Sequence, residues 1–282
     1  MPRPLGAPRF ADTPGRWLAC YRYRCHSEDG SPLSPEQLGS LLGVSGATVR
    51  RWEAGNSKPS EMDLRRFGDI CGLSALELEF ILVAFAAKNL EQPPTEEAFS
   101  HVMPDIISAD FPAYAMDSLF YLRAWNSYMR VFLPFSEGQT PHHILAAHLT
   151  VHAPTEEPEA YEARIDYWIR EFWLSTAGLC GSEPYRRVLA ELRDVPEFEE
   201  RWRRLGLEIS NPKPNGGPYY FTTGRLGVFR VFPVRVNCPP VYHVREHVPL
   251  DAAALAHLDG ERSSGPPSVN LAPDRHWAVE RR

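Results

Sequence analysis

The chain has 282 residues, of which 43% are hydrophobic and 23% are charged, and its formal net charge is −6. This composition is that of an ordinary globular protein, and it excludes a wholly disordered or collagen-like chain. As a total, the negative charge argues against nucleic-acid binding, because phosphate contacts favour basic surfaces. The charge is unevenly distributed, however: residues 1–90 carry a net charge of +1 and residues 91–282 carry −7. The acidity therefore belongs to the larger C-terminal part.

The sequence contains no run of about 18 apolar residues, and its N-terminus lacks the apolar centre of a secretory signal. We therefore expect no membrane span and a cytoplasmic location. The cysteines are odd in number and have no CxxC spacing, which favours reduced thiols over a disulfide framework or a zinc site. They are Cys20, Cys25, Cys71, Cys180 and Cys238.

The first ninety residues predict five short helices. Apolar residues recur at helical spacing between residues 15 and 87, and serines stand where helix N-caps are expected. The first helix is predicted over 15–26 and the second over 35–42, ending at Gly43. The next three helices follow Ser45, Ser60 and Ser74. The second and third helices are joined by a tight Gly-Val-Ser turn, which is the helix-turn-helix arrangement.

The segment LSPEQLGSLLGVSGATVRRWEAGNSKPS, residues 33–60, resembles the XRE family of DNA-binding domains, the lambda-repressor and Cro type. The resemblance covers residues 14–88, with one departure, a longer loop (CHSEDGSP) before Leu33. It implies that the third helix reads the major groove of DNA, and that Arg22 of the first helix pairs with Glu53 as part of the scaffold. The residues that carry it include Leu38, Gly39, Leu42, Val44, Val49, Trp52, Glu53, Pro59 and Ser60.

The third helix is the predicted DNA-reading element. Its outward positions are expected to be Gly46, Ala47, Arg50 and Arg51, and arginine reads guanine through two hydrogen bonds. We expect Arg51, together with Arg50, to carry most of the base readout. Polar residues near helix N-termini are placed for contacts to phosphate. The full set of expected DNA contacts is Ser34, Gln37, Ser45, Gly46, Ala47, Thr48, Arg50, Arg51 and Lys58. The alternative is that the arginines form a solvated helix face.

The remainder predicts two strands, then several helices, then three strands. This order fits a five-stranded antiparallel sheet with a helical insert, which is the connectivity of a PAS domain. The fold class is therefore an all-α helix-turn-helix domain followed by an α+β PAS-like domain. The expected strands are 111–117, 119–125, 219–223, 226–236 and 241–248, and the expected helices are 127–133 (capped by Asn126), 142–151, one through Tyr161, Ile165, Trp168 and Phe172, 184–192 and 196–205.

Three segments of the C-terminal part resemble the ligand-binding domain of MmyB-like transcription regulators. They are PAYAMDSLFYLRAWN (112–126), EPYRRVLAELRDVPEFEERWRR (183–204), and LGVFRVFPVRV with VYHVREHVP (226–249). The resemblance covers residues 104–255 and implies a PAS-like pocket for a fatty-acid-like ligand. The two resemblances, the polar and proline-bearing stretch after residue 88, and the Gly-, Ser- and Pro-rich C-terminal segment together divide the chain into four parts. These are a helix-turn-helix domain at 1–90, a linker at 91–104, a PAS-like domain at 105–256 and a flexible tail at 257–282.

Aromatic residues are dense in this second domain, as an apolar ligand pocket requires. The alternative is that the aromatic stripe on the helix through Trp168 is simply core. A carboxylate head group needs a donor, for which Arg123, Arg170, Arg230 and Asn126 are candidates. The expected ligand-binding residues are Phe120, Arg123, Trp125, Asn126, Trp168, Ile169, Phe172, Phe229 and Arg230.

No catalytic signature is found, so we expect no enzymatic activity and no cofactor beyond the fatty-acid-like ligand. Four histidines, His142, His143, His148 and His152, suggest a metal site but lack a nearby cysteine. Carboxylate groups such as Asp166 with Glu171, or Glu197 with Glu199 and Glu200, are typical of solvated helix faces. The sequence therefore predicts a ligand-responsive regulator that binds a double-stranded operator as a homodimer. The alternative is a lipid-binding protein whose helical N-terminal domain is a protein-interaction module.

Overall fold

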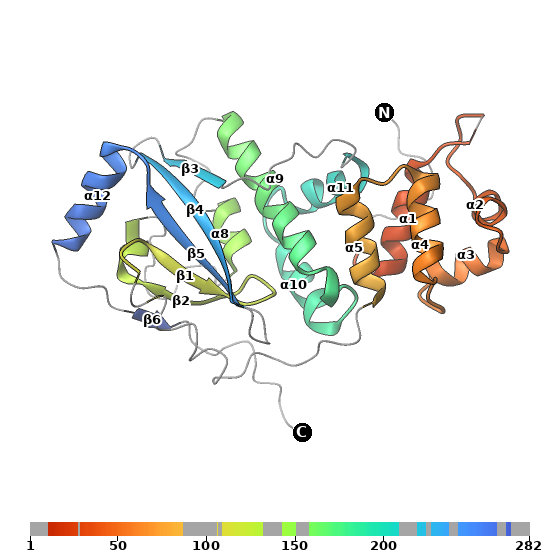
Figure 1. Ribbon diagram of the computed structural model, residues 1–282, viewed down its shortest axis with the longest axis horizontal. Helices are drawn as coiled ribbons and strands as arrows, with labels where there is room; N and C mark the ends of the chain where they lie inside the picture. Colours follow the sequence, from red (N-terminus) through yellow and green to blue (C-terminus); the bar gives the residue numbers. More distant parts are fainter. Residues whose placement is uncertain are drawn as a thin grey trace, which may run out of the picture. The chain divides into compact units, whose positions relative to one another are not determined.

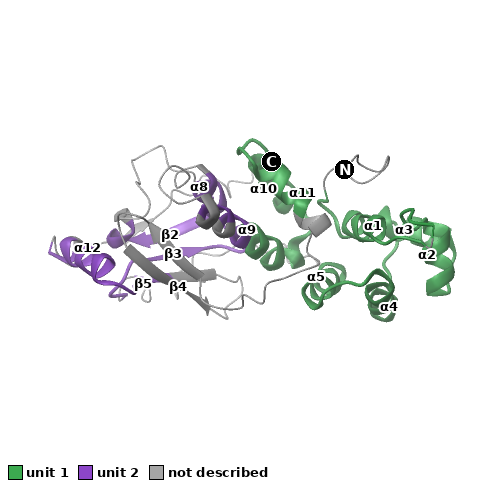
Figure 2. Cartoon of the chain, turned by 90° about the horizontal axis from the view of Figure 1, so that it is seen from above, with its two compact units in different colours: residues 1–90, 169–214 green, residues 91–168, 215–282 purple. Residues whose placement is uncertain are grey.

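The computed structural model divides the chain into two compact units (Figure 2). Unit 1 comprises residues 1–90 and 169–214, and unit 2 comprises residues 91–168 and 215–282. The described residues are 11–27, 29–86, 106, 109–131, 143–150, 158–208, 219–223, 227–236, 242–263 and 269–271.

The five predicted N-terminal helices are confirmed (Figure 1). Serine caps begin four of them: the hydroxyls of Ser34, Ser45, Ser60 and Ser74 each accept a hydrogen bond from the backbone N–H three residues later. Gly43 and Gly72 adopt left-handed backbone conformations that end α2 and α4, with φ of 75° and 60°. The helices are α1 (Pro14–Arg24), α2 (Pro35–Leu42), α3 (Gly46–Glu53), α4 (Glu61–Cys71) and α5 (Ala75–Ala86).

Unit 1 also contains helices from much later in the sequence. The C-terminal part of α9 (Pro158–Ser175) is followed by the 3-10 helix η3 (Ala177–Leu179), α10 (Glu183–Arg193) and α11 (Phe198–Glu208). The sequence placed residues 105–256 in one domain, whereas the structure groups residues 169–214 with the helix-turn-helix segment. Hydrophobic periodicity shows that a helix has a buried face, but it does not show which partner covers that face.

An aromatic core joins the two segments of unit 1. The Trp17 ring lies 5.3 Å from the ring of Phe80 and 5.8 Å from the rings of both Trp173 and Trp202. Phe80 stacks on Trp173 at 4.3 Å between ring centroids. The indole N–H of Trp202 donates to the carbonyl oxygen of Ala11, 3.2 Å away. The first and fifth helices are therefore covered by residues more than 80 positions later in the chain.

Unit 2 is built on a six-stranded antiparallel sheet with the order β3-β4-β5-β1-β2-β6. The five predicted strands form, in the expected chain order, but the sheet has one strand more than the five expected. The sixth strand pairs with β2 and comes from the segment predicted to be a flexible tail. The strands are β1 (Ala113–Met116), β2 (Leu122–Asn126), β3 (Tyr219–Thr223), β4 (Gly227–Val236), β5 (Tyr242–Pro249) and β6 (Val269–Leu271).

A polar cluster holds the connection between β1 and β2. The buried carboxylate of Asp117 accepts hydrogen bonds from the backbone N–H groups of Leu119 and Tyr121 and from the guanidinium of Arg123. Burial raises the pKa of Asp117, although the charge of Arg123 opposes the rise. Phe120 in this turn has a positive φ of 65°.

Asn126 was predicted to cap a helix, and this prediction is wrong. Asn126 is the last residue of β2 and is fully buried. Its carboxamide accepts from the backbone N–H of Ala113 and donates to the carbonyl oxygen of Phe111, so it ties β2 to the start of β1. Residues 127–131 form the 3-10 helix η1 (Ser127–Val131) rather than the α-helix expected over 127–133.

Two further helices lie entirely in unit 2. Helix α8 (Ile144–Thr150) lies beside the N-terminal part of α9, because the His148 ring stacks on Trp168 at 4.6 Å between centroids. Helix α12 (Ala252–Arg262) packs against β4, β5 and η1. It overlaps the segment 257–282 that we expected to be flexible.

Candidate nucleic-acid interface

Helices α2 and α3 form the helix-turn-helix pair, and small residues let them approach closely. A Cβ atom on Gly39 would lie 2.8 Å from the carbonyl oxygen of Val44, and one on Gly46 would lie 2.9 Å from the Cα of Glu36. Any larger side chain at either position would push the helices apart. The glycines therefore fix the beginning of α3 against the beginning of α2.

Helix α3 has one buried face and one exposed face. Val49 and Trp52 are buried, whereas Ala47, Arg50 and Arg51 are exposed. Gly46 was predicted to point outward, and this prediction is wrong. The Cα of Gly46 faces the backbone of Glu36, because the helix pair packs there. The outward surface of α3 therefore consists of Ala47, Arg50 and Arg51, with Thr48 half-buried beside them.

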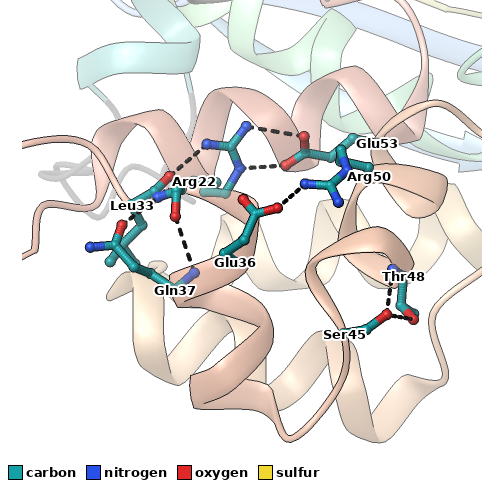
Figure 3. Close-up of polar contacts among 9 residues, drawn as sticks. Arg22, Leu33, Glu36, Gln37, Ser45, Thr48, Arg50 and Glu53 are labelled. Atoms are coloured by element: carbon teal, nitrogen blue, oxygen red, sulfur yellow. Dashed lines mark hydrogen bonds and ion pairs between the residues drawn. The ribbon is translucent and has the colours of Figure 1, made fainter.

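The predicted pair of Arg22 and Glu53 is confirmed (Figure 3). The guanidinium of Arg22 donates from Nε and Nη2 to the two carboxylate oxygens of Glu53, at 2.6 Å and 3.0 Å. Its Nη1 donates to the carbonyl oxygen of Leu33, 2.6 Å away. Burial lowers the pKa of Arg22, but the hydrogen bond and charge of Glu53 outweigh this, and the pKa is raised overall. This pair fixes α1 to the C-terminal end of α3.

The N-caps of α2 and α3 explain how four of the predicted DNA contacts are held. Ser34 and Gln37 form a reciprocal capping box, in which the Ser34 hydroxyl accepts from the Gln37 N–H and the Gln37 carbonyl accepts from the Ser34 N–H. The hydroxyls of Ser45 and Thr48 lie 2.9 Å apart. A capping hydroxyl that accepts from the backbone keeps its own proton, and the Gln37 amide keeps its N–H₂ donors. Ser34 and Gln37 can therefore cap α2 and still donate to a phosphate, and one hydroxyl of the Ser45–Thr48 pair can do so at α3.

The two arginines of α3 differ in their surroundings. Arg50 donates to the carboxylate of Glu36 on α2, and this hydrogen bond lowers the pKa of Glu36. Arg51 is exposed, and within the described part of the chain it makes no ion pair. Lys58, in the loop that follows α3, is likewise exposed there. One guanidinium is thus held in place by a neighbouring helix, and the other is open to solvent.

Glu36 is the residue of this surface that sequence reasoning missed. It lies within the segment 33–60 that resembles the XRE family, but the sequence analysis assigned it no role. The sequence signal for its role was the pair of small residues Gly39 and Gly46, which lets α2 pack closely against α3. This packing places Glu36, in the first turn of α2, beside Arg50.

The structure brings some of the predicted ligand-binding residues together in unit 2. The rings of Phe120 and Trp168 meet edge to face at 6.0 Å, and both residues are buried. Arg123 binds the buried Asp117, and Asn126 binds the backbone of β1. Trp125 is half-buried and pairs with Tyr114 in the sheet.

The remaining candidates are placed differently. Ile169 and Phe172 belong to unit 1, where the Phe172 ring stacks on Tyr185 and lies 5.9 Å from Trp202. Phe229 and Arg230 lie in β4 opposite Phe221 and Tyr220, and their side chains are outside the described residues. The nine candidates therefore do not form one group within either unit.

The histidines considered as metal ligands do not gather into a site in the described residues. His143 is buried, and its ring lies edge to face with Tyr121 at 5.2 Å, whereas His148 stacks on Trp168. His142 and His152 lie outside the described residues. Within the described ranges, no group of three or more His, Cys, Asp or Glu side chains is placed to hold a metal ion. In the same ranges, no helix is long and apolar enough to cross a membrane.

Comparison with protein families places a helix-turn-helix domain at residues 21–80. This range runs from the middle of α1 to the middle of α5 and contains the α2–α3 pair, Glu36 and both arginines of α3. No match is found among curated proteins. The domain and its geometry together indicate a DNA-binding regulator.

Proposed function

We propose that the protein is a ligand-responsive transcription regulator that binds a specific double-stranded operator as a homodimer. The single observation that carries the proposal is the helix-turn-helix pair with a rigidly held α3 whose outward surface presents Arg51 and Arg50. A recognition helix places such side chains on base edges in the major groove, while the preceding helix crosses the backbone. The capped N-termini of α2 and α3 would supply phosphate donors.

The DNA-binding half is tested with Arg51→Ala in the full-length protein. Each well-formed arginine–guanine contact contributes about 1–3 kcal/mol of discrimination, so affinity for the preferred site is expected to fall about 5- to 150-fold. The matched control is Arg66→Ala, which removes an exposed arginine from α4. Unchanged affinity and sequence preference in Arg51→Ala would contradict the assignment of α3 as the reading helix.

Salt dependence separates this function from the alternative of a protein-interaction module. A protein that neutralises several phosphates releases their counterions, so the logarithm of the binding constant falls steeply with the logarithm of salt concentration. A flat dependence on mixed-sequence duplex DNA would favour the interaction module. For a dimer on a palindromic site, the two half-sites are expected about 34–36 Å apart.

We further propose that unit 2 is a PAS-like sensor, similar to that of MmyB-like regulators, for a fatty-acid-like molecule. Support comes from the chain order of β1 to β5, with helices between β2 and β3, and from the pairing of β1 with β5. The buried aromatic pair Phe120 and Trp168 supplies apolar surface, and burial of an acyl chain contributes about 0.8 kcal/mol per methylene. Because Arg123 already binds Asp117, Arg170 and Arg230 are the remaining arginine candidates for the ligand's carboxylate.

Helix α9 supplies Trp168, around which the proposed ligand would bind. Trp168 belongs to unit 2, whereas Ile169, Phe172 and Trp173 on the same helix belong to unit 1. A ligand that prefers one of two arrangements around Trp168 would shift the population of that arrangement. The test is mass spectrometry of organic extracts from the purified protein, compared with a Trp168→Ala variant. An extract without lipid, together with no binding of added C10–C16 fatty acids, would contradict the sensor.

A further inference from the structure

The exposed pair of Glu36 and Arg50 has no evident structural purpose. Their side chains are 61% and 54% exposed, and ion pairs this exposed contribute little to stability. The pair of Arg22 and Glu53, by contrast, is nearly buried. Three nitrogens of Arg22 donate hydrogen bonds, two to the Glu53 carboxylate and one to the Leu33 carbonyl. The fold of unit 1 therefore depends on Arg22 and not on Arg50.

The position of Glu36 is nevertheless fixed by the backbone. The absence of a Cβ on Gly46 lets the Cα of Glu36 approach the first residue of α3. This approach places the carboxylate within hydrogen-bonding distance of Arg50, one turn further along α3. The Glu36 carboxylate is ionised at neutral pH, as an exposed glutamate is, and the hydrogen bond from Arg50 lowers its pKa further.

A carboxylate at this position has a cost in a DNA-binding surface. The first helix of a helix-turn-helix pair crosses the phosphate backbone, and Glu36 lies in the first turn of that helix. A negative charge there repels phosphate, and its pairing with Arg50 occupies a cation that would otherwise bind phosphate. Both effects weaken sequence-independent affinity, which depends mainly on phosphate neutralisation.

We propose that Glu36 is a specificity-determining residue that holds the Arg50 guanidinium over the reading face of α3, so that Arg50 reads a guanine rather than a phosphate. This inference rests on the proposed DNA-binding function. An arginine fixed by a carboxylate presents its remaining N–H donors in one direction, and two parallel donors match the O6 and N7 acceptors of guanine. Glu36 thus acts through Arg50, as a positioning residue.

The experiment selects binding sites for the full-length wild type, Glu36→Gln and Arg50→Ala from a duplex library with a random 20-base-pair core. The wild type is expected to enrich a motif with one guanine whose preference is lost in Arg50→Ala and weakened in Glu36→Gln. On the wild-type motif and its single-base variants, Glu36→Gln is expected to reduce discrimination at that guanine about 3-fold, within the range of an exposed ion pair. Its affinity for a duplex without the motif is expected to rise about 3-fold.

A salt titration gives a second readout that a merely structural role would not change. Release of Arg50 to a phosphate adds one neutralised charge, which steepens the slope of log affinity against log salt by about 0.9. The matched control is Glu61→Gln, which removes the same charge from an exposed glutamate paired with Arg65 on α4. This control is expected to keep both the motif and the slope of the wild type.

The outcomes distinguish the two proposals. If the wild type enriches no motif and its affinity does not depend on salt, the proposed DNA-binding function fails. If the wild type enriches a motif and Glu36→Gln enriches the same motif with equal discrimination and slope, the function stands and the role of Glu36 is overturned. If Glu36→Gln and Glu61→Gln change the discrimination and the salt slope equally, the effect comes from net charge alone, and the proposed role of Glu36 is also overturned.

Discussion

The cores of the two units are built in different ways. In unit 1, aromatic rings from two distant segments of the chain pack together: Trp17, Phe80, Trp173 and Trp202. The buried charge of Arg22 is neutralised by Glu53 on another helix. In unit 2, ionisable and amide groups lie at one hairpin and its neighbours: Asp117, Arg123, Asn126 and His143. Unit 1 should therefore be sensitive to chain truncation, and unit 2 to pH.

The largest effect is expected when residues 91–282 are removed. Truncation leaves Trp17 and Phe80 without Trp173 and Trp202, and exposure of two large aromatic side chains costs about 4–6 kcal/mol. This is a large part of the stability of a small domain. We expect the fragment 1–90 to be unfolded or aggregated, as measured by circular dichroism and one-dimensional proton NMR, although it contains all five helices of the DNA-binding domain.

A point substitution provides the control for this expectation. In the full-length protein, Trp173→Ala should lower the free energy of unfolding of unit 1 by about 3–5 kcal/mol, because it leaves a cavity beside Trp17 and Phe80. Leu41→Ala, at an exposed position of α2, should change it by less than about 0.5 kcal/mol. A fragment 1–90 as stable as the intact chain would show that the helix-turn-helix domain folds without the aromatic contacts to Trp173 and Trp202.

The buried ion pair of unit 1 gives the next largest effect. Arg22→Ala leaves the Glu53 carboxylate and the Leu33 carbonyl without their donors, and loss of one partner of a buried pair costs about 3–5 kcal/mol. Denaturant unfolding measures the loss. The control is Arg65→Ala, which breaks the exposed pair with Glu61 on α4 and should cost about 0–1 kcal/mol. If Arg22→Ala and Arg65→Ala lower the free energy of unfolding equally, burial does not make the Arg22–Glu53 pair more important for stability than an exposed pair.

The smallest effect is expected from the titration of one buried group in unit 2. Burial lowers the pKa of His143 from 6.5 to about 3. The unfolded chain therefore binds one more proton than the native state between these values, so stability is complete above about pH 6.5 and falls as the pH decreases towards 3. We expect this residue to account for a loss of about 3 kcal/mol between pH 7 and pH 4.

The contribution of His143 is isolated by comparison with a variant. His143→Phe keeps an aromatic ring beside Tyr121 but removes the titrating group, so unfolding of unit 2 should depend less on pH between 7 and 4. His257→Gln, which removes an exposed histidine from α12, should leave the pH dependence of the wild type unchanged. Identical pH profiles for the wild type and His143→Phe would show that burial of His143 is not coupled to acid unfolding.

Much of unit 1 follows from local sequence. Ser34, Ser45, Ser60 and Ser74 begin their helices because each hydroxyl accepts from a backbone N–H three residues away. Gly43 and Gly72 end helices because glycine adopts a positive φ without a steric cost. These effects involve neighbours within one helical turn, so the sequence alone determines them. The five strands of unit 2 were predictable for a similar reason, since their apolar runs end at polar or proline-bearing segments.

Only the tertiary structure decided which surfaces meet. The sequence predicted a buried face on the helix through Trp168 and Phe172, but not that Phe172 packs against Tyr185 in unit 1. It predicted that Gly46 and Arg50 point towards DNA, but not that Gly46 faces Glu36 or that Glu36 binds Arg50. The physical reason is range, because a cap or a periodic pattern is specified within a few residues. A partner 14 residues away, as for Glu36 and Arg50, or 156 residues away, as for Trp17 and Trp173, is chosen by packing of the whole chain.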